Sequence, residues 1–217
     1  MLVKEIMKRN VFTLAQDDRI ADAIQLLKQH HIRHIPIINE ERHVIGIVSD
    51  RDLRDAAPSI FDKEFDQNIL NQSIGSIMTS RVITTHPYEY FEDIATIFYE
   101  HEIACLPVIY NKKLVGIVTE KDMLYTFIQL TGTHSPSTQI EIKVPDTVGV
   151  LANVSQIIAK RKIKIVSVYS YPSPTYDGYM ILVFRIQTMN PLVIMQDFEK
   201  TEYEMIYPIR EEDDEFQ

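Results

Sequence analysis

The sequence has 217 residues, of which 45% are hydrophobic and 24% are charged, and its formal net charge is −9. This composition is typical of one or two globular domains, or of three small modules, and it excludes a largely disordered chain. The acidic balance argues against a protein that binds a nucleic acid backbone, and no segment approaches the ~20 apolar residues of a membrane span. We therefore expect a cytoplasmic protein with no membrane or nucleic acid partner.

An internal repeat is the main feature of the first 130 residues. Residues 2–53 and 73–123 follow one pattern, in which Thr13 recurs as Thr84 and Pro36 as Pro107, 71 residues later in each case. Each copy alone is too short to bury a good core. We therefore expect the two copies to fold as a pair.

The first copy begins with a predicted strand at residues 11–14, and Asp17 and Asp18 are then candidates for the N-cap of a helix. The apolar spacing of the next segment predicts an amphipathic helix. The residues on its apolar face are Ile20, Ala23, Ile24, Leu27 and His31. Two apolar runs joined by a polar turn, at residues 35–38 and 44–48, predict a β-hairpin.

A second helix begins after each hairpin, at Ser49 in the first copy and at Thr119 in the second. Each copy is therefore a strand–helix–hairpin–helix unit. Beyond a linker rich in turn formers, at residues 131–137, the pattern changes to alternating strands and helices. The order there is β-α-β-β-α-β, the ferredoxin-like motif, so the fold class is α/β (α+β).

One segment of each copy carries the candidate chemistry. A strand ends at Val48, and a hydroxyl at Ser49 begins a helix whose N-terminal N–H groups favour phosphate. Asp52 lies one turn further on the same face, where its carboxylate could accept both hydroxyls of a ribose. Thr119 and Asp122 repeat the arrangement. An ordinary helix cap would explain one copy, but two copies favour a binding site.

These repeats resemble the cystathionine-β-synthase (CBS) domain pair, or Bateman module, because Val-x-Thr, Ile/Leu-Pro-Val/Ile and Gly-Ile-Val-Ser/Thr-x-x-Asp occur twice in that order. The resemblance implies a regulatory adenosine nucleotide (AMP, ADP, ATP) or a related adenosyl ligand in the clefts between the repeats. It places phosphate at Ser49 and Thr119, ribose at Asp52 and Asp122, cleft walls at Thr13 and Thr84, the base against backbone at Ile35 and Leu106, and phosphate-neutralising charge at Arg33, His34, Arg51 and Lys121. Since Ala104 and Cys105 replace Arg33 and His34 in the second copy, the first cleft is expected to prefer the more anionic ligand.

The C-terminal segment resembles an ACT domain, a small regulatory module that often binds amino acids. Its Asp146, Gly149, Val150 and Leu151 match the Asp-x-x-Gly-x-Leu turn of that family, but Val148 and Lys164 replace residues that are common there. A ligand loop and a dimerisation loop therefore both remain open. The predicted boundaries are 1–54 and 73–130 for the CBS repeats, 55–72 and 131–137 for linkers, 138–210 for the ACT domain and 211–217 for an acidic tail.

The sequence gives no nucleophile–base set and no clear metal site, so we expect no enzyme activity, no catalytic cofactor and no metal. Two CBS repeats followed by an ACT domain resemble the acetoin utilisation proteins of bacilli, which implies a role in the control of acetoin or butanediol catabolism. We expect a homodimer that senses an adenosyl ligand and signals to a regulatory protein partner. The alternative is a dimeric scaffold that binds no nucleotide.

Overall fold

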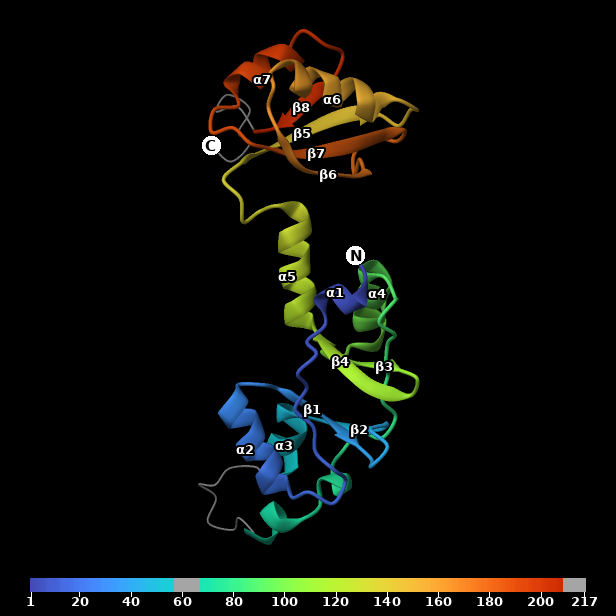
Figure 1. The fold of residues 1–217 in the computed structure, drawn as a ribbon. Coiled ribbons are helices and arrows are strands. Elements are labelled where there is room, and N and C mark those ends of the chain that lie inside the picture. The colour runs from blue at the N-terminus through green and yellow to red at the C-terminus, as the bar shows by residue number, and fades with distance from the viewer. Residues whose placement is uncertain (57–66, 209–217) are drawn as a thin grey trace. The chain divides into compact units, whose positions relative to one another are not determined.

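The computed structural model describes residues 1–56 and 67–208 (Figure 1). The chain divides into two compact units, Met1–Leu124 and Tyr125–Gln217. The expected linker at 55–72 lies partly outside the described residues, and the acidic tail at 211–217 lies entirely outside them. No helix in the described parts of the chain is both long enough and apolar enough to cross a membrane.

The first unit holds two similar sets of helices and strands. The first copy forms α2 (Ile20–His30), β1 (His34–Ile38), β2 (Val44–Ser49) and α3 (Asp50–Ala56). The second forms α4 (Phe91–His101), β3 (Cys105–Tyr110), β4 (Lys113–Thr119) and α5 (Glu120–Thr131), whose last residues belong to the second unit. Short elements precede each set: α1 (Val3–Ile6), and the 3-10 helices η1 (Gln67–Asn71) and η2 (Ile74–Ser76). Each hairpin is an antiparallel two-stranded sheet, so the predicted hairpins and the helices that follow them are confirmed.

Three local predictions in the first copy are wrong. Residues 11–14 form only a parallel bridge between Leu14 and Ile37, because the backbone of Leu14 alone bonds to the strand. The N-cap of α2 is Arg19 and not an aspartate: its N–H donates to Asp22 Oδ2 at 3.2 Å, while Asp18 accepts from the N–H of Ala15. His31 is exposed and ends the helix in the left-handed conformation, with φ 52°.

The two hydrophobic cores of this unit exchange their N-terminal segments. Val3 and Met7 come before the first copy but pack in the core of the second, with Ile94, Phe98 and Leu106. The segment before the second copy does the reverse. Its Ile74 is completely buried in the core of the first copy, where Met78 also packs. Burying such a side chain stabilises the fold by about 1.5–3 kcal/mol, so each core depends on the segment that precedes the other copy.

Backbone pairing and close packing fix these crossed segments. Lys8 and Ile117 exchange two backbone hydrogen bonds of 2.9 Å, and Thr79 and Ile47 form the matching pair at 2.9 and 3.0 Å. Beside them, a Cβ added to Gly46 would lie 2.4 Å from Met78 Sδ. The equivalent Gly116 would meet Met7 Sδ at 2.6 Å. These two glycines allow each methionine to lie directly on the opposite hairpin.

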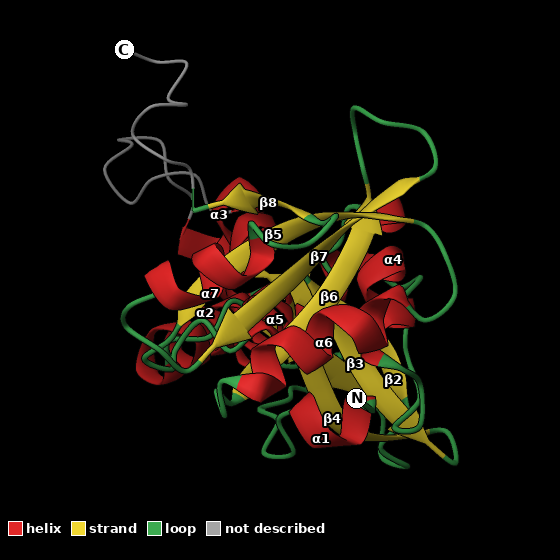
Figure 2. Cartoon of the chain, turned by 90° about the horizontal axis from the view of Figure 1, so that it is seen from above, coloured by secondary structure: helices red, strands yellow, loops and turns green. Residues whose placement is uncertain are grey.

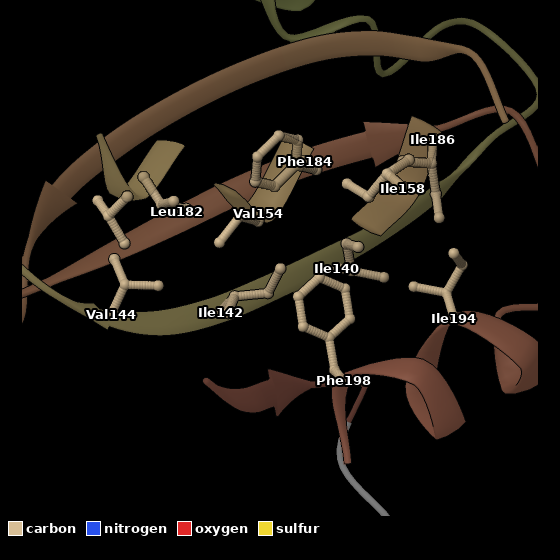
Figure 3. Packing of buried hydrophobic residues seen from close by; sticks show 11 residues of the cluster. Ile140, Ile142, Val144, Val154, Ile158, Leu182, Phe184, Ile186, Ile194 and Phe198 are labelled. Atoms are coloured by element: carbon tan, nitrogen blue, oxygen red, sulfur yellow. The ribbon is translucent and has the colours of Figure 1, made fainter. Parts of the chain in front are cut away.

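The second unit has the predicted βαββαβ order. Its elements are β5 (Thr138–Pro145), α6 (Val150–Lys160), β6 (Ile165–Pro172), β7 (Tyr179–Ile186), α7 (Leu192–Phe198) and β8 (Glu204–Tyr207). The strands form one antiparallel sheet in the order β6-β7-β5-β8 (Figure 2). One face of the sheet packs on the two helices, where Ile140, Phe184 and Phe198 are among the completely or almost completely buried residues (Figure 3).

Candidate functional site

The segment that joins β2 to α3 forms a closed hydrogen-bond ring. Ser49 donates to Asp52 Oδ2 from both its backbone N–H, at 2.8 Å, and its Oγ, at 2.7 Å. In return, the N–H of Asp52 donates to Ser49 Oγ at 3.2 Å. This is a reciprocal helix cap. It holds the hydroxyl and the carboxylate together at the start of the helix, both half-buried.

The second copy repeats both donations to the aspartate before α5. Thr119 donates to Asp122 Oδ2 from its N–H, at 3.0 Å, and from its Oγ1, at 2.6 Å. The carboxylate is again largely shielded, with 14% of the Asp122 side chain exposed. Both predicted Ser/Thr–Asp pairs therefore come together, and each uses one oxygen of its aspartate for the cap.

The first residue of each hairpin lies opposite the Ser or Thr that directly precedes the following helix. His34 is paired with Ser49 across β1 and β2, and Cys105 is paired with Thr119 across β3 and β4. The carbonyls of Arg33 and Ala104 accept the first helical N–H groups, from Asp50 at 2.9 Å and Glu120 at 3.2 Å. Each helix N-terminus is thus held against the strand that enters the same hairpin.

His34 and Cys105 give the two sites different titration properties. Burial lowers the pKa of His34 below its ordinary 6.5, although Asp50, Asp52 and Glu120 act in the opposite direction. Burial also raises the pKa of Cys105 to about 12, with Asp122 adding to the effect. Cys105 is itself buried, at 6% exposure, and its thiol stays protonated and unreactive at neutral pH.

The other predicted site residues differ in what they can offer a ligand. The side chains of Ile35 and Leu106 are completely buried in the two cores, so only their backbone could meet a base. Thr13 and Thr84 are half-buried. Their neighbours Leu14 and Thr85 form backbone hydrogen bonds with β1 and β3, respectively. Arg33, Arg51 and Lys121 are exposed, and exposed cations of this kind could turn toward a phosphate.

One charged residue at the second site was missed by the sequence reasoning. The Nζ atom of Lys8 lies 2.8 Å from Asp122 Oδ1. The signal was available, because Lys8 stands where the second copy has Thr79 in an otherwise matched pair of segments. Its significance is clear only from the crossed backbone pairing, which brings the N-terminal segment to the second copy.

The ACT turn presents three of its four predicted residues to solvent. Asp146, Gly149 and Leu151 are exposed, whereas Val150 belongs to the core beneath them. Gly149 has φ 90°, a conformation that favours glycine, and it caps α6. Among residues 1–56 and 67–208, no three His, Cys, Asp or Glu side chains lie close enough together to hold a metal ion.

Comparison with known families gives two matches along the chain. The family model of the CBS domain matches residues 3–59 and 74–128, and that of the ACT domain matches residues 138–202. An uncharacterized protein of Methanocaldococcus jannaschii is 32% identical over 131 residues. That alignment covers 60% of this chain but only 43% of the relative, so the chain spans less than half of the relative's length.

Two solved structures resemble the first unit in fold and in sequence. A Vibrio cholerae protein assigned to acetoin utilization (AcuB) is 30% identical, with a TM-score of 0.54, over 62% of this chain and 95% of that one. The CBS domain pair of protein MJ0100, solved with 5′-methylthioadenosine and S-adenosyl-L-methionine, is also 30% identical. Its TM-score is 0.52, over 62% of this chain and 98% of that one. Neither alignment extends over the whole of this chain.

Proposed function

Since the chain belongs to the CBS domain family and carries an ACT domain after its two CBS repeats, we propose that it is a non-enzymatic regulatory protein that senses an adenosyl ligand. Asp52 and Asp122 would accept the ribose hydroxyls, while Ser49 and Thr119 would face the phosphate. The ligand would stabilise one arrangement of the two repeats, which a partner protein would recognise. Such a shift requires different affinities for the two arrangements.

The observation that carries this proposal is the duplicated ring of hydroxyl and carboxylate. Asp52 uses Oδ2 for its cap, and among the described residues no cation lies within ion-pair distance of its other oxygen. A ribose hydroxyl could bond there without breaking the cap. The MJ0100 pair, which is 30% identical, was solved with two adenosyl compounds, and this supports the same ligand class here.

A dimeric scaffold without a nucleotide is the second candidate, and one observation favours it. The caps satisfy the hydroxyls of Ser49 and Thr119 within the chain, so the local structure is complete without a ligand. The two candidates differ in one property that can be measured. Only a sensor gains stability when an adenosyl compound is added.

Thermal unfolding of the purified chain with AMP, ADP, ATP, S-adenosylmethionine and 5′-methylthioadenosine would separate the candidates. A compound that binds only the folded state adds about 2.7 kcal/mol at 100 times its Kd, and the sensor proposal expects such a shift from at least one of them. Asp52→Ala and Asp122→Ala should each reduce it. Asp22→Ala is the matched control, because it removes a helix cap in the same repeat but lies outside both sites. No shift with any compound would favour the scaffold.

We also propose that the chain forms a homodimer through β6, which is an edge strand of eight residues without a charged side chain. Exposed edges of this kind pair readily with another chain. In an antiparallel pair of two β6 strands, Val168 near the centre would lie close to its own copy. Val168→Glu should therefore convert a dimer to a monomer in light scattering, because like charges would then face each other. An unchanged mass would contradict pairing through this edge.

We also propose the following further properties of the chain. A second ligand or a dimer contact at the ACT turn is supported by its exposure and by the open space around Gly149. A role in acetoin or butanediol catabolism draws support from the likeness to the Vibrio cholerae protein. A cytoplasmic location and the boundaries expected above, including repeats at 1–54 and 73–130, belong to the same proposal.

A further inference from the structure

The second site carries a lysine that comes from the other end of the unit. Lys8 Nζ lies 2.8 Å from Asp122 Oδ1, while Oδ2 of the same carboxylate accepts the hydroxyl of Thr119 at 2.6 Å. The Asp122 carboxylate therefore forms an ion pair with Lys8 and accepts a hydrogen bond from Thr119. The Lys8 side chain is 58% exposed, so it can move away from Asp122 without breaking the core.

The position of Lys8 is set by the backbone. Its N–H and C=O both bond to Ile117 in β4, at 2.9 Å, two residues before Thr119. Beside it, Met7 is fixed against Gly116, where no Cβ would fit without displacing the sulfur. The lysine is thus anchored by its backbone and has an exposed side chain. That combination suits a group that changes partners when a ligand enters.

The first site lacks this cation. Thr79 occupies the equivalent backbone position, with the same pair of hydrogen bonds to Ile47, and threonine cannot form an ion pair. The first site instead has Arg33 directly before β1, where the second site has the neutral Ala104. The two sites therefore receive an additional positive charge from different parts of the chain. The charge difference expected from residues 33 and 34 alone is offset by Lys8.

We propose that Lys8 is the residue that makes the second site selective for adenosyl ligands with an anionic group, an inference that rests on the proposed function. Two ribose hydroxyls at Asp122 would displace the lysine from Oδ1. An anionic ligand gives the ammonium group a new partner, and charge-assisted hydrogen bonds are the stronger class. An uncharged ligand leaves it unpaired, and a cationic ligand places a like charge beside it.

Calorimetric titration of the full chain with AMP and with adenosine tests this inference. Asp52→Ala serves as the background, because it disables the first site. In that background, Lys8→Thr should weaken AMP binding by about ten-fold or more and leave adenosine binding unchanged or tighter. Lys8→Arg should keep the preference for AMP. Lys4→Thr is the control for the loss of one N-terminal charge, since Lys4 lies over the Tyr88 ring, away from Asp122.

The reciprocal change provides a gain-of-function test. In an Asp122→Ala background, Thr79→Lys should raise the preference of the first site for AMP over adenosine. Equal effects of Lys8→Thr on both ligands, or no effect on either, would overturn the inference while the proposed function stands. If the unmodified chain binds neither AMP nor adenosine, the inference is overturned, and the result also counts against the proposed function.

Discussion

The crossed cores make a quantitative prediction for Gly46→Ala. The added methyl group would lie 2.4 Å from Met78 Sδ, 3.0 Å from its Cγ and 3.3 Å from its Cβ. Ordinary contacts of this type are 3.4–4 Å, so the methionine and its segment must move by up to about 1 Å. Overpacking of this kind costs about 1–3 kcal/mol. We expect Gly46→Ala to lower the free energy of unfolding by that amount.

A double-mutant cycle identifies the cause of that loss. In a Met78→Ala background only the 3.3 Å contact with Cβ remains, so Gly46→Ala should cost less than about 0.5 kcal/mol, and the difference is the coupling energy of the pair. Gly116→Ala and Met7→Ala form the corresponding cycle in the second core, where a 3.1 Å contact with the backbone oxygen of Lys8 remains in either background. The mixed cycle of Gly46→Ala with Met7→Ala is the control and should be additive, because the two residues belong to different cores.

Urea unfolding followed by circular dichroism gives the required free energies, provided that the first unit unfolds in one resolved transition. Equal costs of Gly46→Ala with and without Met78 would refute the crossed packing. So would a coupling energy in the mixed cycle as large as those in the matched cycles.

Two further predictions concern single side chains. The Oγ1 atom of Thr85 is buried with no hydrogen-bond partner in the described parts of the chain, so Thr85→Val should raise stability by about 1 kcal/mol in urea unfolding; a loss would mean that the hydroxyl is satisfied. Because burial lowers the pKa of His34 in the folded state, the unfolded state binds the proton more readily, and the free energy of unfolding should fall as the pH drops through 6.5. His34→Asn should reduce that fall between pH 7.5 and 5.5, and an identical pH dependence in the variant would contradict the assignment.

Most of the secondary structure follows from local sequence patterns. Both hairpins and the ferredoxin-like order were predictable, because strand alternation and turn residues act over a few positions. The N-cap of α2 was not, since two aspartates in a row gave no reason to prefer Arg19. The strand at residues 11–14 failed because a short apolar run does not reveal how many of its backbone groups find a partner.

A repeat pattern alone could not predict the exchange of the N-terminal segments. A repeat shows that two segments are alike, and it does not show which hairpin each one packs against. The clue was present in Gly46 and Gly116, since a glycine inside a strand often marks a close approach of another segment. Their contacts with Met78 and Met7 explain why both methionines recur. The same exchange explains why Lys8 was missed, since its partner Asp122 lies at the far end of the unit.

The residues of the candidate site could be named from the sequence, but the hydrogen bonds and the ion pair that join them could not. The spacing of Ser49 and Asp52 implied both a cap and a ligand site, and the structure forms the cap in both copies. The proposed difference between the sites rests on Arg33 and His34, which the sequence already singled out, and on Lys8, which only the folded chain brings to Asp122.

The central claim is that both Ser/Thr–Asp rings bind an adenosyl ligand, and calorimetric titration with AMP tests it most directly. We expect two binding events per chain in the unmodified protein, one event after either Asp52→Ala or Asp122→Ala, and none in the double variant. Each loss corresponds to at least about 1–3 kcal/mol of binding free energy. Unchanged AMP binding in a double variant that folds as well as the Asp22→Ala control would contradict the assignment of both sites.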